Sequence, residues 1–258
     1  MKSMKGVLFV VALTITFLSG LLITKQVRVH GASSNDKPYT LITVSYGVNN
    51  GQSQDYEKVT LMHRSDGATS ESSARQFGKD VGTNSRRVDF PDGAEVLISD
   101  DAHVKSTIKL KLSPAVARDS RTCALPGQPV DGQEMIGGHK AIRFVSPLGS
   151  AGSTVISTTG RVVELFLPDF NCAAVSLQEQ HKDASSGEWV TNQGFRLVSI
   201  TEGEPSASLF TGFDNYTEST VSEFKKALLL SHGVTEQACP HCFDPDKSGD
   251  LYYGNHRP

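Results

Sequence analysis

The sequence has few aromatic residues and no marked excess of positive or negative charge. Aromatic residues make up 7% of the 258 positions, and there is a single tryptophan. Lys and Arg number 25 against 28 Asp and Glu, and no long run of either sign follows the amino terminus. A protein that binds nucleic acid usually presents a basic patch or stripe. The composition therefore predicts no nucleic acid partner, and its polar, Gly-rich character suits a sheet covered on one face.

Motifs of the common catalytic sites are also missing. The chain contains no GxSxG, HExxH or phosphate-binding loop, so no local pattern assembles its Ser, His and Asp residues. Four histidines stand singly: His63, His103, His139 and His181. We therefore expect a protein without a cofactor and more in keeping with a binding role than with an enzyme.

Long apolar runs are absent except at the amino terminus. Residues 6–24, GVLFVVALTITFLSGLLIT, carry no charge and are closed by Lys25. A run of about 19 apolar residues suffices to cross a bilayer, and it exceeds the usual signal-peptide core of about 7 to 15. The small residues of VHGAS also offer a cleavage site.

Residues 1–31 are thus either a signal anchor or a cleaved signal peptide, with residues 32–38 as a polar linker. Either alternative predicts that the rest of the chain is exported. We expect the exported part to be in the cell envelope, anchored in the membrane by residues 6–24 and facing the periplasm or exterior. If the leader is cleaved, we expect it to be secreted.

Only four cysteines occur, and an even number in an exported chain is usually paired. Cys123 in RTCALPG and Cys172 in DFNCAAV lie beside turn-like residues. Of the three possible pairings we favour Cys123 with Cys172 and Cys239 with Cys242. The first bond would close a loop of roughly 50 residues and stabilise the fold by about 4 kcal/mol.

Short alternating segments predict a mainly β domain from residue 39 onward. VKSTIKLKL, for example, places Val104 and Ile108 on one face and Lys105 and Lys109 on the other. Asp92-Gly93 separates SRRVDF from AEVLISD and is a strong hairpin signal. Strands do not alternate with long helices, which argues against a doubly wound or thioredoxin fold. We expect a curved antiparallel sheet, open or half-closed into a barrel.

One helix is predicted near the carboxyl end, at residues 221–232. Thr220 and Glu223 form a capping box, and Gly233 is the stop signal. This helix would complete an exported domain spanning residues 39–233, which leaves 234–258 as a carboxy-terminal tail.

The order LMHRSDGATS, SRRVDFPDGAEVLISDD, RVVELFLPDFNCAAV and GEPSASLF resembles exported bacterial proteins with the fold of the lipoprotein carriers LolA and LolB. The resemblance spans Tyr39 to Phe210 and rests on strand rhythm and polar turns. It implies an incomplete barrel covered by helices on its concave side, which binds a lipophilic ligand or another envelope protein. The chain departs from the carriers in having one clear helix and in its cysteines, and the resemblance carries over no ligand-contacting residue.

Cys239-Pro-His-Cys242 has the spacing of a thiol redox centre and matches the motif of the DsbA-type oxidoreductases. In those enzymes the motif lies early in a thioredoxin fold, whereas here it follows the last helix. Three alternatives remain: thiol exchange, a static disulfide, or a metal site completed by His232, His241 or His256. We favour the static disulfide, because a single CxxC is a weak zinc signal.

DPDKSGD resembles the first half of a calcium loop. Asp244, Asp246, Ser248 and Asp250 stand at the first, third, fifth and seventh positions of such a loop, which supply oxygen ligands to calcium. Asn255 stands where the loop needs a bidentate Glu. A solvated turn is therefore favoured over a calcium site.

Overall fold

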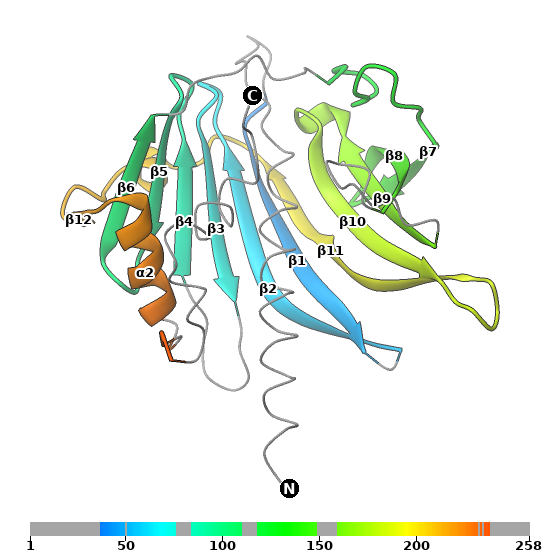
Figure 1. The fold of residues 1–258 in the computed structure, drawn as a ribbon. Helices are drawn as coiled ribbons and strands as arrows, with labels where there is room; N and C mark the ends of the chain where they lie inside the picture. The colour runs from blue at the N-terminus through cyan, green and yellow to red at the C-terminus, as the bar shows by residue number, and fades with distance from the viewer. Residues whose placement is uncertain are drawn as a thin grey trace, which may run out of the picture. The chain divides into compact units, whose positions relative to one another are not determined.

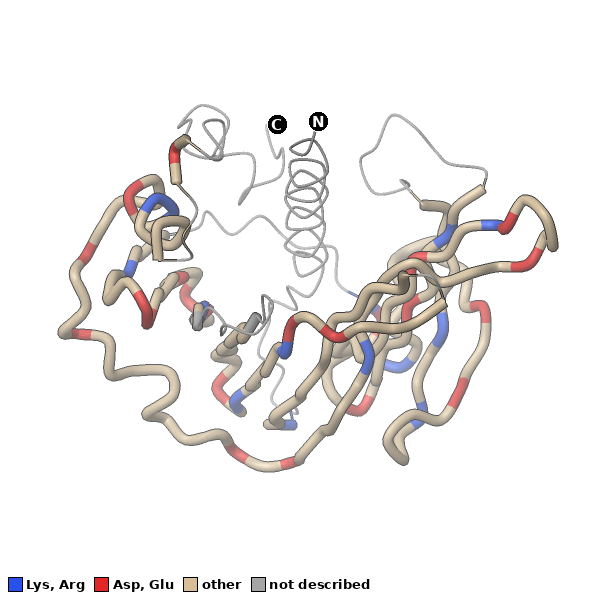
Figure 2. The backbone as a smooth tube through the Cα atoms, turned by 90° about the horizontal axis from the view of Figure 1, so that it is seen from below, with Lys and Arg blue, Asp and Glu red and all other residues tan. Residues whose placement is uncertain are grey.

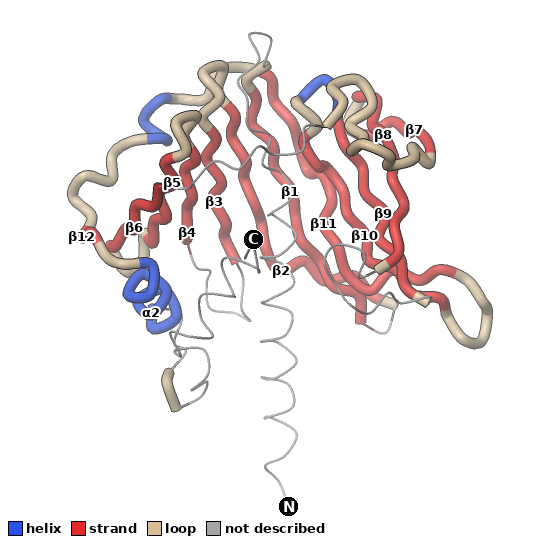
Figure 3. The backbone as a smooth tube through the Cα atoms, turned by 45° about the horizontal axis from the view of Figure 1, so that its top comes forward, coloured by secondary structure: helices blue, strands red, loops and turns tan. Residues whose placement is uncertain are grey.

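Twelve strands form one sheet in the order β12-β6-β5-β4-β3-β2-β1-β11-β10-β9-β8-β7 (Figures 1 and 3). The computed structural model describes residues 37–49, 51–75, 84–109, 118–148, 159–231, 233 and 235–237. Within these residues, every strand pair is antiparallel except the short pairing of β12 with β6. The strands are β1 (Tyr39–Asn49), β2 (Gln52–His63), β3 (Thr69–Arg75), β4 (Asn84–Asp89), β5 (Ala94–Ser99), β6 (Val104–Lys109), β7 (Gly132–Ile136), β8 (His139–Pro147), β9 (Gly160–Leu167), β10 (Ala173–Lys182), β11 (Trp189–Glu202) and β12 (Thr217–Glu218). The chain divides into two compact units, one containing the whole sheet (Val29–Glu218) and one containing the helix α2 (Val221–Ser231).

The strands form where side chains alternate along the sequence. In β1, Tyr39, Leu41 and Thr43 are buried, while the residues between them are partly exposed. This is the period of two that a pleated strand imposes. At the predicted hairpin between β4 and β5, Gly93 has a φ of 84° and its N–H donates to the carbonyl of Phe90 at 3.0 Å. The prediction of an antiparallel β domain is confirmed.

The sheet is curved and does not close (Figure 2). Its main apolar cluster comprises Tyr39, Leu41, Ala141, Leu165, Leu167, Phe170, Ala173 and Val175. Ile136 of β7 and Leu197 of β11 pack against this same cluster, although three strands separate β7 from β11. A Cβ placed on Gly137 would lie 2.9 Å from Cδ2 of Leu197. This half of the sheet therefore curls until its outer hairpin reaches β11.

Two further apolar clusters lie on the opposite face. Met62 belongs to one of them, and its neighbour Leu61 packs against the main cluster. Ile142 belongs to the other, and its neighbour Ala141 is in the main cluster. Successive side chains of a strand point to opposite faces. Phe210, in the 3-10 helix η3 (Ala207–Phe210), covers the cluster of Met62. The loop carrying Cys123 covers the cluster of Ile142.

The helix α2 has the ends that its sequence predicts. The N–H of Glu223 donates to Oγ1 of Thr220 at 3.2 Å, and the N–H of Thr220 donates to Oε2 of Glu223 at 2.9 Å. Gly233 follows with a φ of 71°, and its N–H donates to the carbonyl of Leu230. Residue 232, the predicted last residue, lies outside the described part of the chain.

Within the described residues, no helix has the length and apolar character needed to span a membrane. The predicted membrane segment, residues 6–24, lies outside these residues. Its role as a signal anchor or signal peptide stays a prediction.

The only tryptophan lies at the hairpin that joins β10 to β11. Trp189 is the first residue of β11 and is 37% exposed. The guanidinium of Arg161, on β9, stacks 4.2 Å from its ring. This cation–π contact holds the base of the hairpin on its neighbouring strand.

Candidate functional site

One face of β3, β4 and β5 carries four charged side chains. We call Glu71, Arg87, Asp89 and Glu95 the charged face. Glu71 lies opposite Arg87, and Asp89 lies opposite Glu95. Glu71 is also opposite Leu61, which packs in the main apolar cluster, so the charged face continues the face of that cluster.

Arg87 links the acidic residues around it. Its Nη2 lies 3.6 Å from Oε2 of Glu71, and its Nε donates to Oδ2 of Asp89 at 3.1 Å. On β2, Glu57 accepts a hydrogen bond from Oγ of Ser73. The arrangement resembles a salt-bridge network more than a catalytic dyad, because a guanidinium stands between the carboxylates.

The charged face is largely withdrawn from water. The side chains of Glu71, Arg87 and Asp89 are 21%, 23% and 19% exposed, and Glu95 as a residue is 4% exposed. Burying a charge costs free energy unless it is paired. Asp89 and Glu95 are like charges directly opposite each other, an arrangement that destabilises a strand pair. Arg87 offsets part of this repulsion, and the face keeps three carboxylates around one guanidinium, an excess of negative charge that packing alone does not explain.

The pKa values of this face follow from its burial and charges. Burial raises the pKa of Glu71; Arg87 opposes that shift, and Asp89 and Glu57 add to it. Burial disfavours the cation of Arg87, but attraction to Glu71, Asp89 and Glu95 outweighs burial and raises its pKa. Arg87 thus stays a cation, and Glu71 takes up a proton more readily than an exposed glutamate. Perturbed groups of this kind gather at functional sites.

A second polar group lies where β1 and β2 meet the 3-10 helix η2 (Pro168–Phe170). His63 is 4% exposed, its ring stacks on Tyr39, and Nδ2 of Asn171 donates to its Nε2 at 2.9 Å. Phe170 contacts both Tyr39 and His139 edge-on. His63 is packed and hydrogen-bonded on this side of the core, which fits a structural role.

Cys123 and Cys172 form a disulfide with a Cα–Cα separation of 5.4 Å, the pairing that the sequence favours. Cys123, Asn171 and Cys172 have φ values of 55°, 53° and 55°, in the left-handed region that residues other than glycine seldom adopt. Such residues persist where the surroundings over-determine them. The disulfide joins two of these positions and so holds both turns.

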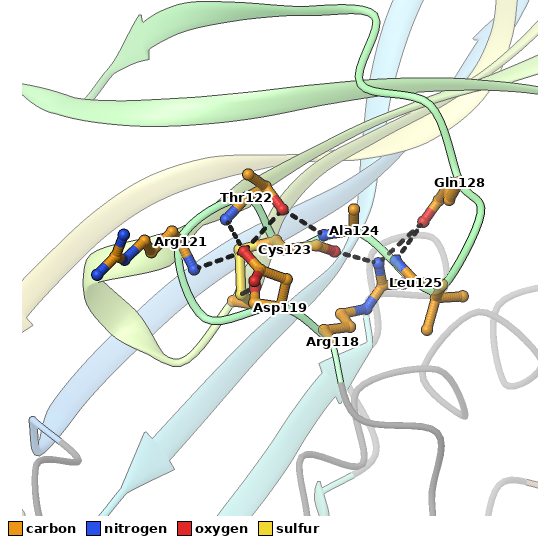
Figure 4. Close-up of a disulfide and its surroundings, with 9 residues drawn as sticks. Arg118, Asp119, Arg121, Thr122, Cys123, Ala124, Leu125 and Gln128 are labelled. Carbon is orange, nitrogen blue, oxygen red and sulfur yellow. Dashed lines mark hydrogen bonds between the residues drawn. A yellow bond between two sulfur atoms is a disulfide. The ribbon is translucent and has the colours of Figure 1, made fainter.

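The loop around Cys123 is fastened by its own side chains (Figure 4). Oδ1 of Asp119 accepts from the N–H groups of Arg121 and Thr122. Arg118 donates from Nη1 to the carbonyl of Cys123 at 2.7 Å, and its guanidinium lies 4.2 Å from the ring of Phe166. These contacts account for the loop as a structural cover over the cluster of Ile142.

The other sequence-predicted site residues lie outside the described part of the chain. They are Cys239, Cys242, Asp244, Asp246, Ser248 and Asp250. Among the residues that the structure does describe, no three His, Cys, Asp or Glu side chains gather as a metal site would require. The CPHC disulfide and the calcium turn stay predictions.

Sequence reasoning missed the charged face because no motif joins its members, which come from three different strands. One pair carried a usable signal: Asp89 and Glu95 flank the predicted Asp92-Gly93 turn almost symmetrically, so the turn itself sets them opposite each other. Nothing local places Glu71 beside Arg87. Their contact depends on the register between β3 and β4.

No protein-family model and no curated protein matches the sequence. Among solved structures, the chain is similar to MucB in complex with MucA(peri), with 13% identity, a TM-score of 0.38, and coverage of 73% of this chain and 59% of that one. It is also similar to a LolA superfamily protein from Nitrosomonas europaea, with 9% identity, a TM-score of 0.29, and coverage of 69% and 91%.

Proposed function

We propose that this chain is a non-catalytic binding protein of the cell envelope that holds another envelope protein through a cationic segment seated on the charged face. The observation that carries the proposal is the placement of Asp89 directly opposite Glu95, with Glu71 on the next strand. Natural proteins keep destabilising arrangements mainly where function needs them. A Lys or Arg side chain from a partner would add a second cation to the three carboxylates that share Arg87.

The apolar interior supports a protein partner over a lipophilic ligand. The buried residues of the main cluster are at most 7% exposed, so almost none of their surface is open to solvent. A lipid would have to displace them, at the cost of contacts in a close-packed core. The carboxylates of Glu71 and Asp89, whose side chains are 21% and 19% exposed, suit a cation better than a lipid tail.

The disulfide supports the envelope as the compartment. A bond such as Cys123–Cys172 forms and persists in oxidising surroundings such as the periplasm. Residues 6–24 add a route of export. The alternative of a thiol redox or metal-binding protein rests on Cys239 and Cys242 and is kept as a separate prediction.

The test is cross-linking of the full-length chain in its own host, followed by mass spectrometry of the cross-linked peptides. We expect one envelope protein to be linked to β3–β5 through a segment rich in Lys or Arg. The double variant Glu71→Gln, Asp89→Asn should lose this link. Glu188→Gln, an exposed carboxylate at the β10–β11 hairpin, is the matched control and should keep it.

Native mass spectrometry of the same purified chain tests the alternative of a bound lipid. A lipid retained on the wild-type chain, together with unchanged cross-links in the double variant, would overturn the proposal in favour of a lipid carrier.

A further inference from the structure

The two edges of the sheet differ in how they are covered. At one edge β12 covers β6: the N–H of Thr107 donates to Oε1 of Glu218 at 2.8 Å, and Glu218 also lies 3.8 Å from Lys105. At the other edge, β7 pairs with β8 alone among the strands that the structure describes. Proteins usually cover, charge or shorten such an edge, because its free N–H and C=O groups invite pairing.

The β7–β8 hairpin holds this open edge in a fixed geometry. Gly137 and Gly138, with φ values of 56° and 83°, make the two-residue turn that suits a tight hairpin. Ile136 packs in the main apolar cluster beside this turn. Counted from the turn, the alternation of an antiparallel ladder directs the backbone N–H and C=O groups of Gln133 and Met135 away from β8.

The side chains of this edge are open to solvent. Gln133, Glu134 and Met135 are all exposed, and Met135 is 69% exposed. Val130, just before the strand, is 42% exposed. Glu134 lies opposite Ala141 of β8 and so points to the face away from Met135.

We propose that β7 receives an extended segment of another protein as an additional strand, in which a Lys or Arg stands opposite Glu134 between two apolar residues. Main-chain hydrogen bonds to Gln133 and Met135 would supply affinity, and the alternating side chains would supply specificity. The residue opposite Glu134 belongs to a non-hydrogen-bonded pair, in which side chains lie closest. This site is separate from the charged face and does not depend on it.

The charge of Glu134 argues against a second copy of this chain as the occupant. Two copies related by a twofold axis would pair β7 antiparallel to itself. Because Glu134 is the central residue of Gly132–Ile136, full overlap places it opposite its own equivalent. Like charges directly opposite each other destabilise the pair, and a cationic residue there stabilises it.

The test uses the full-length chain and fluorescence anisotropy of a labelled peptide, Ser-Thr-Val-Lys-Val-Thr-Ser. A second peptide carries Glu in place of Lys, and a third is N-methylated at the amides that would donate to β7. We expect the wild-type chain to bind the Lys peptide about tenfold more tightly than the Glu peptide, and the N-methylated peptide about tenfold more weakly.

Three variants separate backbone pairing from charge. Gln133→Pro removes an outward N–H without touching the bonds to β8, so its unfolding midpoint should match the wild type while its affinity for the Lys peptide falls about tenfold. Glu134→Lys should reverse the preference between the Lys and Glu peptides. Glu188→Lys makes the same charge change on the β10–β11 hairpin and should behave as the wild type.

Several results would overturn the proposal. These are no binding of the Lys peptide to the wild-type chain, equal binding by Gln133→Pro, or an unchanged preference in Glu134→Lys. Sedimentation that shows a wild-type dimer abolished by Gln133→Pro would assign the edge to a second copy instead. Each result leaves the cross-linking test of the charged face unaffected.

Discussion

At the scale of single residues, Glu71 couples the charged face to pH. Its pKa in the folded chain is raised above the ordinary 4.5, chiefly by burial. The folded state therefore holds this proton more tightly than the unfolded state, and the stability contributed by the group falls as pH rises above 4.5. We expect Glu71→Gln, which cannot titrate, to lose less stability than the wild type between mildly acidic and neutral pH.

Urea unfolding across this pH range measures the difference. Glu188→Gln should follow the wild-type profile, because Glu188 is exposed. Parallel profiles for Glu71→Gln and the wild type would show that the carboxyl has no raised pKa.

The disulfide is the second residue-scale feature with a measurable consequence. Cys123 and Cys172 are 49 residues apart in sequence, and constraining a loop of that length in the unfolded chain stabilises the fold by about 4 kcal/mol. We expect the double variant Cys123→Ser, Cys172→Ser to lose about that much free energy of unfolding in guanidinium. A much smaller loss would mean that Asp119 and its hydrogen bonds hold the loop without the bond.

At the scale of the strand, Gly194 is the described glycine with the least room for a side chain. A Cβ at this position in β11 would lie 2.0 Å from the carbonyl oxygen of Leu177 on β10. Because backbone cannot yield as a flexible side chain does, we expect Gly194→Ala to destabilise the fold by about 1–3 kcal/mol. Hydrogen exchange should quicken in β10 and β11 first.

Gly47→Ala is the matched control. Gly47 lies in β1, and a Cβ there meets nothing within 4 Å. It should unfold close to the wild type, and equal stability of both alanine variants would contradict the steric argument.

The same scale shows which elements could be predicted from sequence. The helix α2 and the β4–β5 hairpin were predictable because their signals are local: a capping box at Thr220 and Glu223, and Asp92-Gly93 between alternating runs. The strand β3, TSESSAR, was missed because it has polar residues on both faces, with Glu71 on the charged face. The strand β7, GQEMI, was missed because an exposed edge has no buried face to set an alternation.

At the scale of the whole molecule, the sheet forms a unit of its own. The unit Val29–Glu218 contains all twelve strands and the disulfide. We expect a fragment spanning residues 37–218, oxidised, to unfold in one cooperative transition. Calorimetry tests this, with the full-length chain as the comparison, and a broad, non-cooperative transition would contradict it.

The curvature of the sheet could be anticipated only in outline. A curved antiparallel sheet follows from the strand rhythm, but the contact of Gly137 with Leu197 joins residues that no local pattern relates. Bulges such as the one between Ile42 and Thr43 in β1 bend the strands, and their positions depend on pairing with β11. The depth of the curl is thus a tertiary property.

Trp189, stacked with Arg161, is an intrinsic fluorescence probe of the β10–β11 hairpin. Because no other tryptophan is present, all indole fluorescence comes from the base of the β10–β11 hairpin. A half-exposed indole shifts its emission to longer wavelength when it becomes fully hydrated. Opening of this hairpin can therefore be followed in real time by emission wavelength, without a label and without altering the sequence.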